Sequence, residues 1–100
     1  MSRQLRTTKS FRSDYKKLSN DEVSETDVVV KKLMNDEPLD EKYRDHDLHG
    51  NYKGCRECHI RPDLLLVYKK GIDGKLLILT LYRISSHTNI FDTKKSQKKK

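Results

Sequence analysis

The chain lacks the features that mark membrane and exported proteins. Its 100 residues include no tryptophan, two cysteines, two prolines and four glycines, and only 33% of them are apolar. No apolar stretch approaches the roughly 20 residues of a membrane-spanning helix. The basic segment 1–11 also lacks the apolar core of a secretory signal. We therefore expect one small cytoplasmic domain that contacts no membrane and keeps its cysteines reduced.

Charge is abundant, because 37% of the residues are charged and the net charge is +7. The distribution is uneven: segment 21–50 carries four positive and ten negative residues, whereas both flanks are basic. A basic surface favours polyanions, and nucleic acid is the commonest of them. An ordinary solvated surface with a basic tail fits the composition equally well. Both alternatives therefore stay open at this point.

The first part of the chain predicts an edge strand followed by two helices. Residues 2–9 alternate loosely between apolar and polar types, which suits an edge strand. Ser10 can cap a first helix, whose apolar stripe consists of Phe11, Tyr15 and Leu18. A second helix from about 22 to 35 has an apolar face of Val23, Val30, Leu33 and Met34. The valine triplet 28–30 would also suit a strand.

The second part predicts a sheet. Residues 44–54 are rich in polar and turn residues and predict a long loop. Three strands follow: CRECHI at 55–60, LLLVYKK at 64–70 and KLLILTLYR at 75–83. The middle strand is apolar on both faces and should therefore be central. Between the last two strands, GIDG offers Gly71 and Gly74 for a turn with positive φ.

The resulting element order is β-α-α-β-β-β, which indicates an α+β domain with a small, mostly antiparallel sheet. We expect this domain to cover residues 1–92. Residues 93–100 carry five lysines in eight positions and predict a disordered basic tail.

The segment CRECH at 55–59 matches the Cys-x-x-Cys-His pattern of haem attachment. Successive side chains of a strand point to opposite faces, so Cys55 and Cys58 should face apart. The same parity disfavours a zinc site made of His46, His49, Cys55 and Cys58, and the gap between the two pairs is short for zinc folds. We therefore predict no metal, no cofactor and two reduced packing cysteines.

Histidines border the predicted sheet. Strand parity places His59 on the face opposite Cys58, and the carboxylate of Asp63 follows across the turn. His46 precedes the strands, Arg83 ends the last of them, and His87 and Phe91 follow it. RNA cleavage without a metal needs a base for the 2′-OH, an acid for the 5′-oxygen and a cation for the phosphorane. The residues alone indicate a basic protein with a histidine-rich site.

Three motifs carry a resemblance to a known family. Asp-His-x-Leu-x-Gly, Arg-Glu-x-His-Ile-x-Pro-Asp-Leu and Arg-x-x-x-His-x-x-x-Phe occur in order within segment 45–91. In these motifs the chain resembles the YafQ-type branch of the RelE-like bacterial toxins, in the RelE/ParE superfamily. The resemblance covers Thr8 to Phe91. It implies a RelE-like fold with two N-terminal helices, in agreement with the predicted order.

The resemblance also implies an activity, that of a ribosome-dependent endoribonuclease that cuts mRNA. It assigns the catalytic roles to His46, His59, Asp63 and His87. His87 matches the general acid, and either His46 or His59 matches the base. The residues expected to contact the RNA are Lys53, Arg56, Arg83 and Phe91.

As a type II toxin, the chain would have a cognate antitoxin as partner, besides the ribosome and mRNA. Operator DNA would be bound only through the antitoxin complex. Ser85 stands where many relatives have glycine, which raises the question of backbone strain before His87. The alternative is a basic RNA- or ribosome-binding module without catalysis, or a toxin homologue inactivated by drift.

Overall fold

A five-stranded sheet organises the fold. The computed structural model describes residues 3–48 and 50–91, with the strands in the order β1-β5-β4-β3-β2. β1 runs parallel to β5, and the other neighbouring pairs are antiparallel. The elements in chain order are β1 (Gln4–Thr7), α1 (Lys9–Tyr15), α2 (Asn20–Met34), η1 (Glu41–Tyr43), β2 (His46–Asp47), η2 (Gly50–Tyr52), β3 (Arg56–Arg61), β4 (Leu64–Asp73), β5 (Leu76–Ser85) and α3 (His87–Phe91). This α+β order confirms the prediction, and β2 and α3 are additions to it.

Both N-terminal helices begin slightly earlier than predicted, because other residues cap them. The Thr8 hydroxyl accepts a hydrogen bond from the Phe11 backbone N–H (3.0 Å), so the predicted cap, Ser10, lies inside α1. Ser19 and Glu22 form a capping box at the start of α2, in which each side chain accepts the other residue's backbone N–H. α2 therefore begins two residues before the predicted position.

The buried stripe of α2 is centred differently from the prediction. Its fully buried residues are Thr26, Val29 and Leu33. Their spacing of three and four residues follows one face of a helix. Val30 and Met34 are only partly buried at the edge of this stripe, and Val23 is half-buried. The valine triplet is helical, so the strand alternative for it is wrong.

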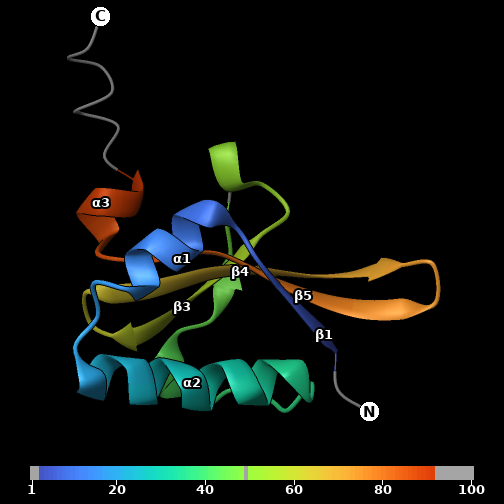
Figure 1. Ribbon diagram of the computed structural model, residues 1–100, viewed down its shortest axis with the longest axis horizontal. Coiled ribbons are helices and arrows are strands. Elements are labelled where there is room, and N and C mark those ends of the chain that lie inside the picture. The colour runs from blue at the N-terminus through green and yellow to red at the C-terminus, as the bar shows by residue number, and fades with distance from the viewer. Residues whose placement is uncertain (1–2, 49, 92–100) are drawn as a thin grey trace, which may run out of the picture.

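β4 is the central strand, as its continuous apolar run predicts. Leu64–Tyr68 are all buried, with β3 on one side and β5 on the other. The β4–β5 hairpin is longer than predicted, because Gly71 pairs with Ile78 inside the ladder. The turn falls instead at Gly74, with φ +64°, and Lys75. As a result, the hairpin extends beyond the helices (Figure 1).

Alternating strand side chains build two cores on opposite faces of the sheet. The larger core, beneath α1 and α2, consists of Phe11, Val29, Leu33, Cys58, Leu64, Leu66, Tyr68, Leu79, Leu81 and Ile84. The smaller core consists of Cys55, Leu65, Val67 and Ile90. Figure 1 shows α2 along one side of the sheet and α3 beyond the other. The two helical layers therefore hold the sheet from both faces.

Within the described residues, every helix is too short or too polar to cross a membrane. The predicted basic tail at 93–100 and His49 lie outside the described residues.

Thr26 offers a test of the larger core. It is fully buried, and its Oγ1 has no hydrogen-bond partner within residues 3–48 and 50–91. Thr26→Val should raise the free energy of unfolding by ~1 kcal/mol, because a methyl group replaces an unsatisfied hydroxyl. Thr26→Ser is the matched control, and it should lower stability by ~0.8 kcal/mol through loss of one buried methyl. Urea unfolding measures both, and a destabilised valine variant would contradict the expectation.

Candidate active site

The register of the sheet brings three predicted site residues to the face of the smaller core. His46 pairs with Glu57, Glu57 with Val67, and Val67 with Arg83, across four neighbouring strands. Residues paired directly across antiparallel strands have side chains on the same face. His59 shares this face because it lies two residues after Glu57 on β3. The site is therefore a row across the sheet, on the face opposite α2.

A nearly buried carboxylate lies between two of the imidazoles. Glu57 Oε1 is 2.9 Å from His46 Nε2 and 3.7 Å from His59 Nε2. The two imidazole ring centres are 6.3 Å apart. The Glu57 side chain is only 5% exposed, and its Oε2 has no hydrogen-bond partner among the described residues. A carboxylate buried in this way requires a positive charge beside it.

His46 is the group placed to supply that charge. Nδ1 lies 2.7 Å from the Arg44 carbonyl oxygen, which can only accept, so Nδ1 donates. Nε2 faces the Glu57 carboxylate, which is also an acceptor when ionised. A ring protonated at both nitrogens would therefore donate to the Arg44 carbonyl and pair with the ionised Glu57 carboxylate. His59 is held more loosely, since its Nδ1 is 3.4 Å from the Pro62 carbonyl oxygen and its Nε2 lies beyond hydrogen-bond distance of Glu57.

Asp45 fixes the segment that carries His46. Its carboxylate accepts hydrogen bonds from the Tyr68 hydroxyl (2.5 Å) and from the Arg56 guanidinium (3.1 Å to Nη2). Arg56 also donates to Asp47 (2.6 Å). The hydrogen bond to Asp45 raises the pKa of Arg56, and burial together with Asp45 raises that of Tyr68 well above its ordinary value. Arg56, which was predicted to contact RNA, is thus engaged by two carboxylates that hold the loop.

Arg83 is oriented by α1. Asp14 accepts hydrogen bonds from Arg83 Nε (2.6 Å) and Nη2 (3.0 Å), and also from the Ile84 backbone N–H (3.1 Å). The Asp14 hydrogen bonds raise the pKa of Arg83, and Tyr52 of η2 contributes in the same direction. A bidentate ion pair of this kind fixes the plane of the guanidinium. Arg83 therefore has a defined orientation between α1 and η2.

Asp63 acts on the backbone of His87. Its Oδ1 accepts the His87 N–H (3.1 Å), which ties the β3–β4 turn to the start of α3. Ser86 Oγ accepts the Asn89 N–H (3.1 Å) in the same turn of helix, and Ile90 anchors α3 in the smaller core. The expected partner of Asp63 was an imidazole, whereas the partner in its hydrogen bond is a main-chain group. Asp63 thus positions His87 without touching its ring through this bond.

The other predicted residues have less defined surroundings. Lys53 is exposed just after η2. Ser85 ends β5 and is not among the described residues with positive φ, so the serine meets no backbone penalty. Its hydroxyl accepts a hydrogen bond from the Asn89 side-chain amide (3.0 Å). Phe91 ends α3, and its side chain lies outside the described part of the chain.

The two cysteines lie on opposite faces, as strand parity predicts. Cys58 belongs to the larger core and Cys55 to the smaller one, and both are free thiols. Burial raises the pKa of Cys58 to about 12 and also raises that of Cys55. Within the described residues, no group of three His, Cys, Asp or Glu side chains is arranged to hold a metal ion.

Two residues of the site were not predicted, Glu57 and Asp14. Strand parity carries a signal for Glu57, because it stands two residues before His59 and so points to the same face. No local pattern identifies Asp14, which is 69 positions from Arg83 along the chain. Only the packing of α1 against β5 brings that pair together.

The fold is that of a small toxin-like protein, because solved structures that share it include bacterial toxins. The copper-bound L66S mutant toxin from Helicobacter pylori has a TM-score of 0.78 and 40% identity, covering 91% of this chain and 100% of that one. The Escherichia coli DinJ-YafQ toxin-antitoxin complex has a TM-score of 0.74 and 29% identity, covering 91% and 99%.

The particular family follows from the sequence match. The model of "Bacterial toxin of type II toxin-antitoxin system, YafQ" matches residues 3–92, so the chain belongs to the YafQ toxin family. A YafQ relative of Haemophilus influenzae is 43% identical over 56 residues, 56% of this chain. The mRNA interferase toxin YafQ of Escherichia coli K12 is 39% identical over 59 residues, 59% of this chain. The chain spans 55% and 60% of the length of these two relatives.

The buried thiols allow a direct test of the cysteine geometry. At pH 8 a chromogenic disulfide reagent should label the native protein slowly, because burial raises the pKa of both thiols and only thiolates react. Denatured protein should react at once with two equivalents. In a Cys55→Ser variant Cys58 is the remaining thiol, so this variant should retain only the slower of the two labelling reactions. Rapid native labelling would contradict the burial of the thiols, and an intramolecular disulfide after mild oxidation would contradict the opposite-face arrangement.

Proposed function

We propose that this chain is the toxin of a type II toxin-antitoxin system and cuts mRNA on the ribosome by acid-base catalysis. The observation that carries the proposal is the row of His46, Glu57 and His59 on the same sheet face as Arg83. The family match supports it, since an Escherichia coli relative bears the name mRNA interferase toxin. The reaction begins with attack of a ribose 2′-oxygen on the adjacent phosphorus.

His59 is the proposed base. It is half-buried on the site face, and none of its hydrogen bonds within the described residues requires a second proton on the ring. A neutral imidazole can take the proton of the 2′-OH at neutral pH with little tuning. His46 has the complementary role, because a doubly protonated ring held by Glu57 can stabilise negative charge on the phosphorane.

His87 is the proposed acid and Arg83 the second cation. The His87 side chain is exposed at the start of α3, where Asp63 holds its backbone. It gives a proton to the leaving 5′-oxygen as the bond from that oxygen to phosphorus breaks. The products are a 5′-OH end and a 2′,3′-cyclic phosphate, which water can open to a 3′-phosphate. Arg83, oriented by Asp14, binds the phosphate oxygens. Phe91 and Lys53 remain proposed contacts to the RNA.

The proposed partners are the ribosome with its message and a cognate antitoxin. The Escherichia coli DinJ-YafQ complex supports the antitoxin, because that structure joins a relative of this chain to such a protein. Operator DNA is reached only through the antitoxin complex. The second candidate function is ribosome or RNA binding without cleavage, and the net charge of +7 would serve it equally.

His87→Ala should lower single-turnover cleavage of a ribosome-bound message by ~10²–10⁴-fold, because the leaving oxygen loses its acid. His59→Ala should fall in the same range. Mapping of the product ends should find a cyclic phosphate or a 3′-phosphate. His49→Ala is the control, because His49 has no role in the proposed mechanism, and this variant should cleave normally. Full activity in His87→Ala, or a 5′-phosphate product, would refute the mechanism and favour the non-catalytic function.

Glu57→Gln should also lower cleavage, by ~10²-fold or more, because the amide keeps the shape of the side chain but removes the charge that holds His46. His46→Ala should have a similar effect. If the two act as one unit, the double variant should be no slower than the slower single variant. If the losses in cleavage rate multiply in the double variant, Glu57 and His46 act independently. Antitoxin binding serves as the check that the variants are folded.

A further inference from the structure

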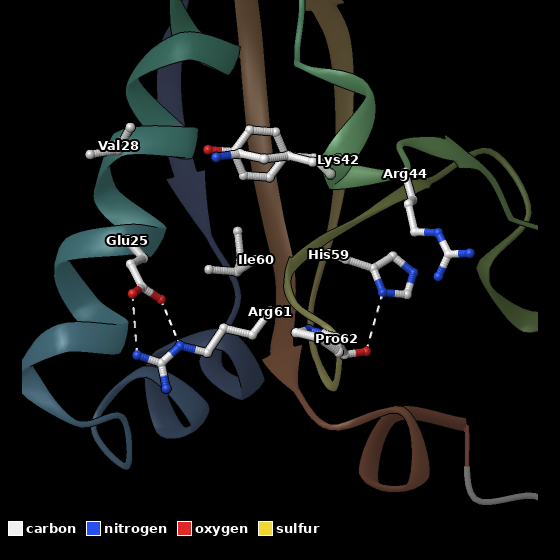
Figure 2. Close-up of a pocket in the computed structure, with 9 residues that line it drawn as sticks. Glu25, Val28, Lys42, Arg44, His59, Ile60, Arg61 and Pro62 are labelled. Atoms are coloured by element: carbon white, nitrogen blue, oxygen red, sulfur yellow. Dashed lines mark hydrogen bonds and ion pairs between the residues drawn. The ribbon is translucent and has the colours of Figure 1, made fainter.

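A pocket of about 590 Å³ lies beside the site row, where β2 ends and the outer edge of β3 becomes open. α2, η1 and the turn after β3 surround it. Figure 2 shows His59 and Arg44 at one end and the Glu25–Arg61 pair at the other. His59 is the residue that the pocket shares with the proposed catalytic row. The pocket therefore lies next to the proposed catalytic row.

The floor of the pocket is apolar. The side chains that form it are Val28, Tyr43, Ile60 and Pro62. Val28 is 52% exposed, although it belongs to a helix whose neighbouring stripe is fully buried. The volume lies in the range of small-molecule binding sites and accommodates a nucleobase with its sugar.

The rim of the pocket is cationic. Arg61 is used internally: it donates to both oxygens of Glu25 (2.7 and 3.2 Å) and thereby lowers the pKa of that carboxyl. Lys42 and Arg44 are different, because neither is within ion-pair distance of a carboxylate of any described residue. Both are exposed, and the Lys42 ammonium lies 5.2 Å from the ring centre of Tyr43. The rim thus has two cations available for an anionic ligand.

Arg44 is also held in an unusual backbone conformation. Its φ is +50°, in the left-handed region that glycine adopts without a steric cost. The same residue offers its carbonyl oxygen to His46 Nδ1. A glycine here could make that backbone contact with less strain, so the contact alone does not account for an arginine. The side chain of Arg44 therefore calls for a separate role.

We infer that this pocket binds a nucleotide of the message adjacent to the cleaved bond, with its base on the apolar floor and its phosphate between Arg44 and Lys42. The inference rests on the proposed function. Charge decides the ligand class: an unpaired arginine and lysine beside a catalytic imidazole suit a phosphodiester chain. Apolar surface suits a base, which every nucleotide carries whatever the sequence. The pocket then aligns the strand on His59.

The experiment combines a substitution that fills the pocket with messages that lack one base. Val28→Trp should fill the pocket and lower kcat/KM for a ribosome-bound message by roughly tenfold, the scale of one lost base contact. Messages with one abasic nucleotide, placed in turn at each of the two positions on either side of the cleaved bond, should show a similar loss at one position only. At that position, Val28→Trp and the abasic nucleotide combined should lower kcat/KM no further than either change alone.

The control is Ser24→Trp, which adds the same side chain to an exposed position of α2 outside the pocket lining. It should cleave the intact message normally, and the abasic nucleotide should lower its kcat/KM by the same factor as in the wild-type protein. If Val28→Trp multiplies with the abasic loss at every position, or leaves cleavage unchanged, the inference is wrong. A wild-type protein that fails to cleave the intact message would instead refute the proposed function itself.

A binding assay on a non-cleavable 2′-O-methyl oligonucleotide tests the rim without requiring catalysis. Arg44→Gly should preserve or increase thermal stability, yet it should weaken binding. The slope of log affinity against log salt concentration is negative, and it should become less steep by about 0.7, as expected for one lost contact to single-stranded RNA. Lys75→Ala, at the distant hairpin turn, is the control and should leave the slope unchanged.

An acidic peptide of the antitoxin is the competing ligand. Binding of the isolated antitoxin to the same variants separates the two classes. If Val28→Trp and Arg44→Gly weaken antitoxin binding but leave oligonucleotide binding and cleavage unchanged, the pocket serves a protein and the nucleotide inference is wrong. Weakened oligonucleotide binding, with normal antitoxin binding, supports it.

Discussion

The nearly buried carboxyl group of Glu57 constrains the site. Its Oε1 lies 2.9 Å from Nε2 of His46, the imidazole that is placed to offset the cost of burying it. That requirement explains why the segment before β3 is built so firmly. Arg44 must present a carbonyl to the ring, and Asp45 must tie the segment to Tyr68 and Arg56. Disturbing any of these would leave the carboxylate without its counter-charge.

Carboxylates on distant elements have a similar role elsewhere in the site. Asp14 on α1 orients Arg83, and Asp63 in the β3–β4 turn holds the start of α3. Neither acid needs to touch a substrate to matter. Each converts a flexible side chain or a short helix into a fixed element, which is what a catalytic geometry demands. The acidic residues of this basic protein thus organise its cations.

The two-faced sheet makes this arrangement possible. The helices α1 and α2 cover one face and bury the larger core, so most of the buried apolar side chains lie on that face. The opposite face can then carry charged and polar groups, with only a small core under α3. The open edge of β3 adds a third surface, where the pocket beside His59 lies. Because strand side chains alternate between the two faces, the larger core and the charged groups of the site lie on opposite faces of the sheet.

The sequence determined the element order, the central place of β4 and the opposite orientations of Cys55 and Cys58, because these follow from local periodicity. It also placed His59 on the site face. Helix starts and the hairpin turn were shifted by a few residues, since capping by Thr8 and pairing of Gly71 depend on partners elsewhere. Tertiary structure alone decided that Asp63 binds the backbone of His87, that Arg56 is held by carboxylates and that Asp14 reaches Arg83. Such contacts join segments far apart in the chain, and no local pattern encodes which charges will meet once the apolar faces are buried.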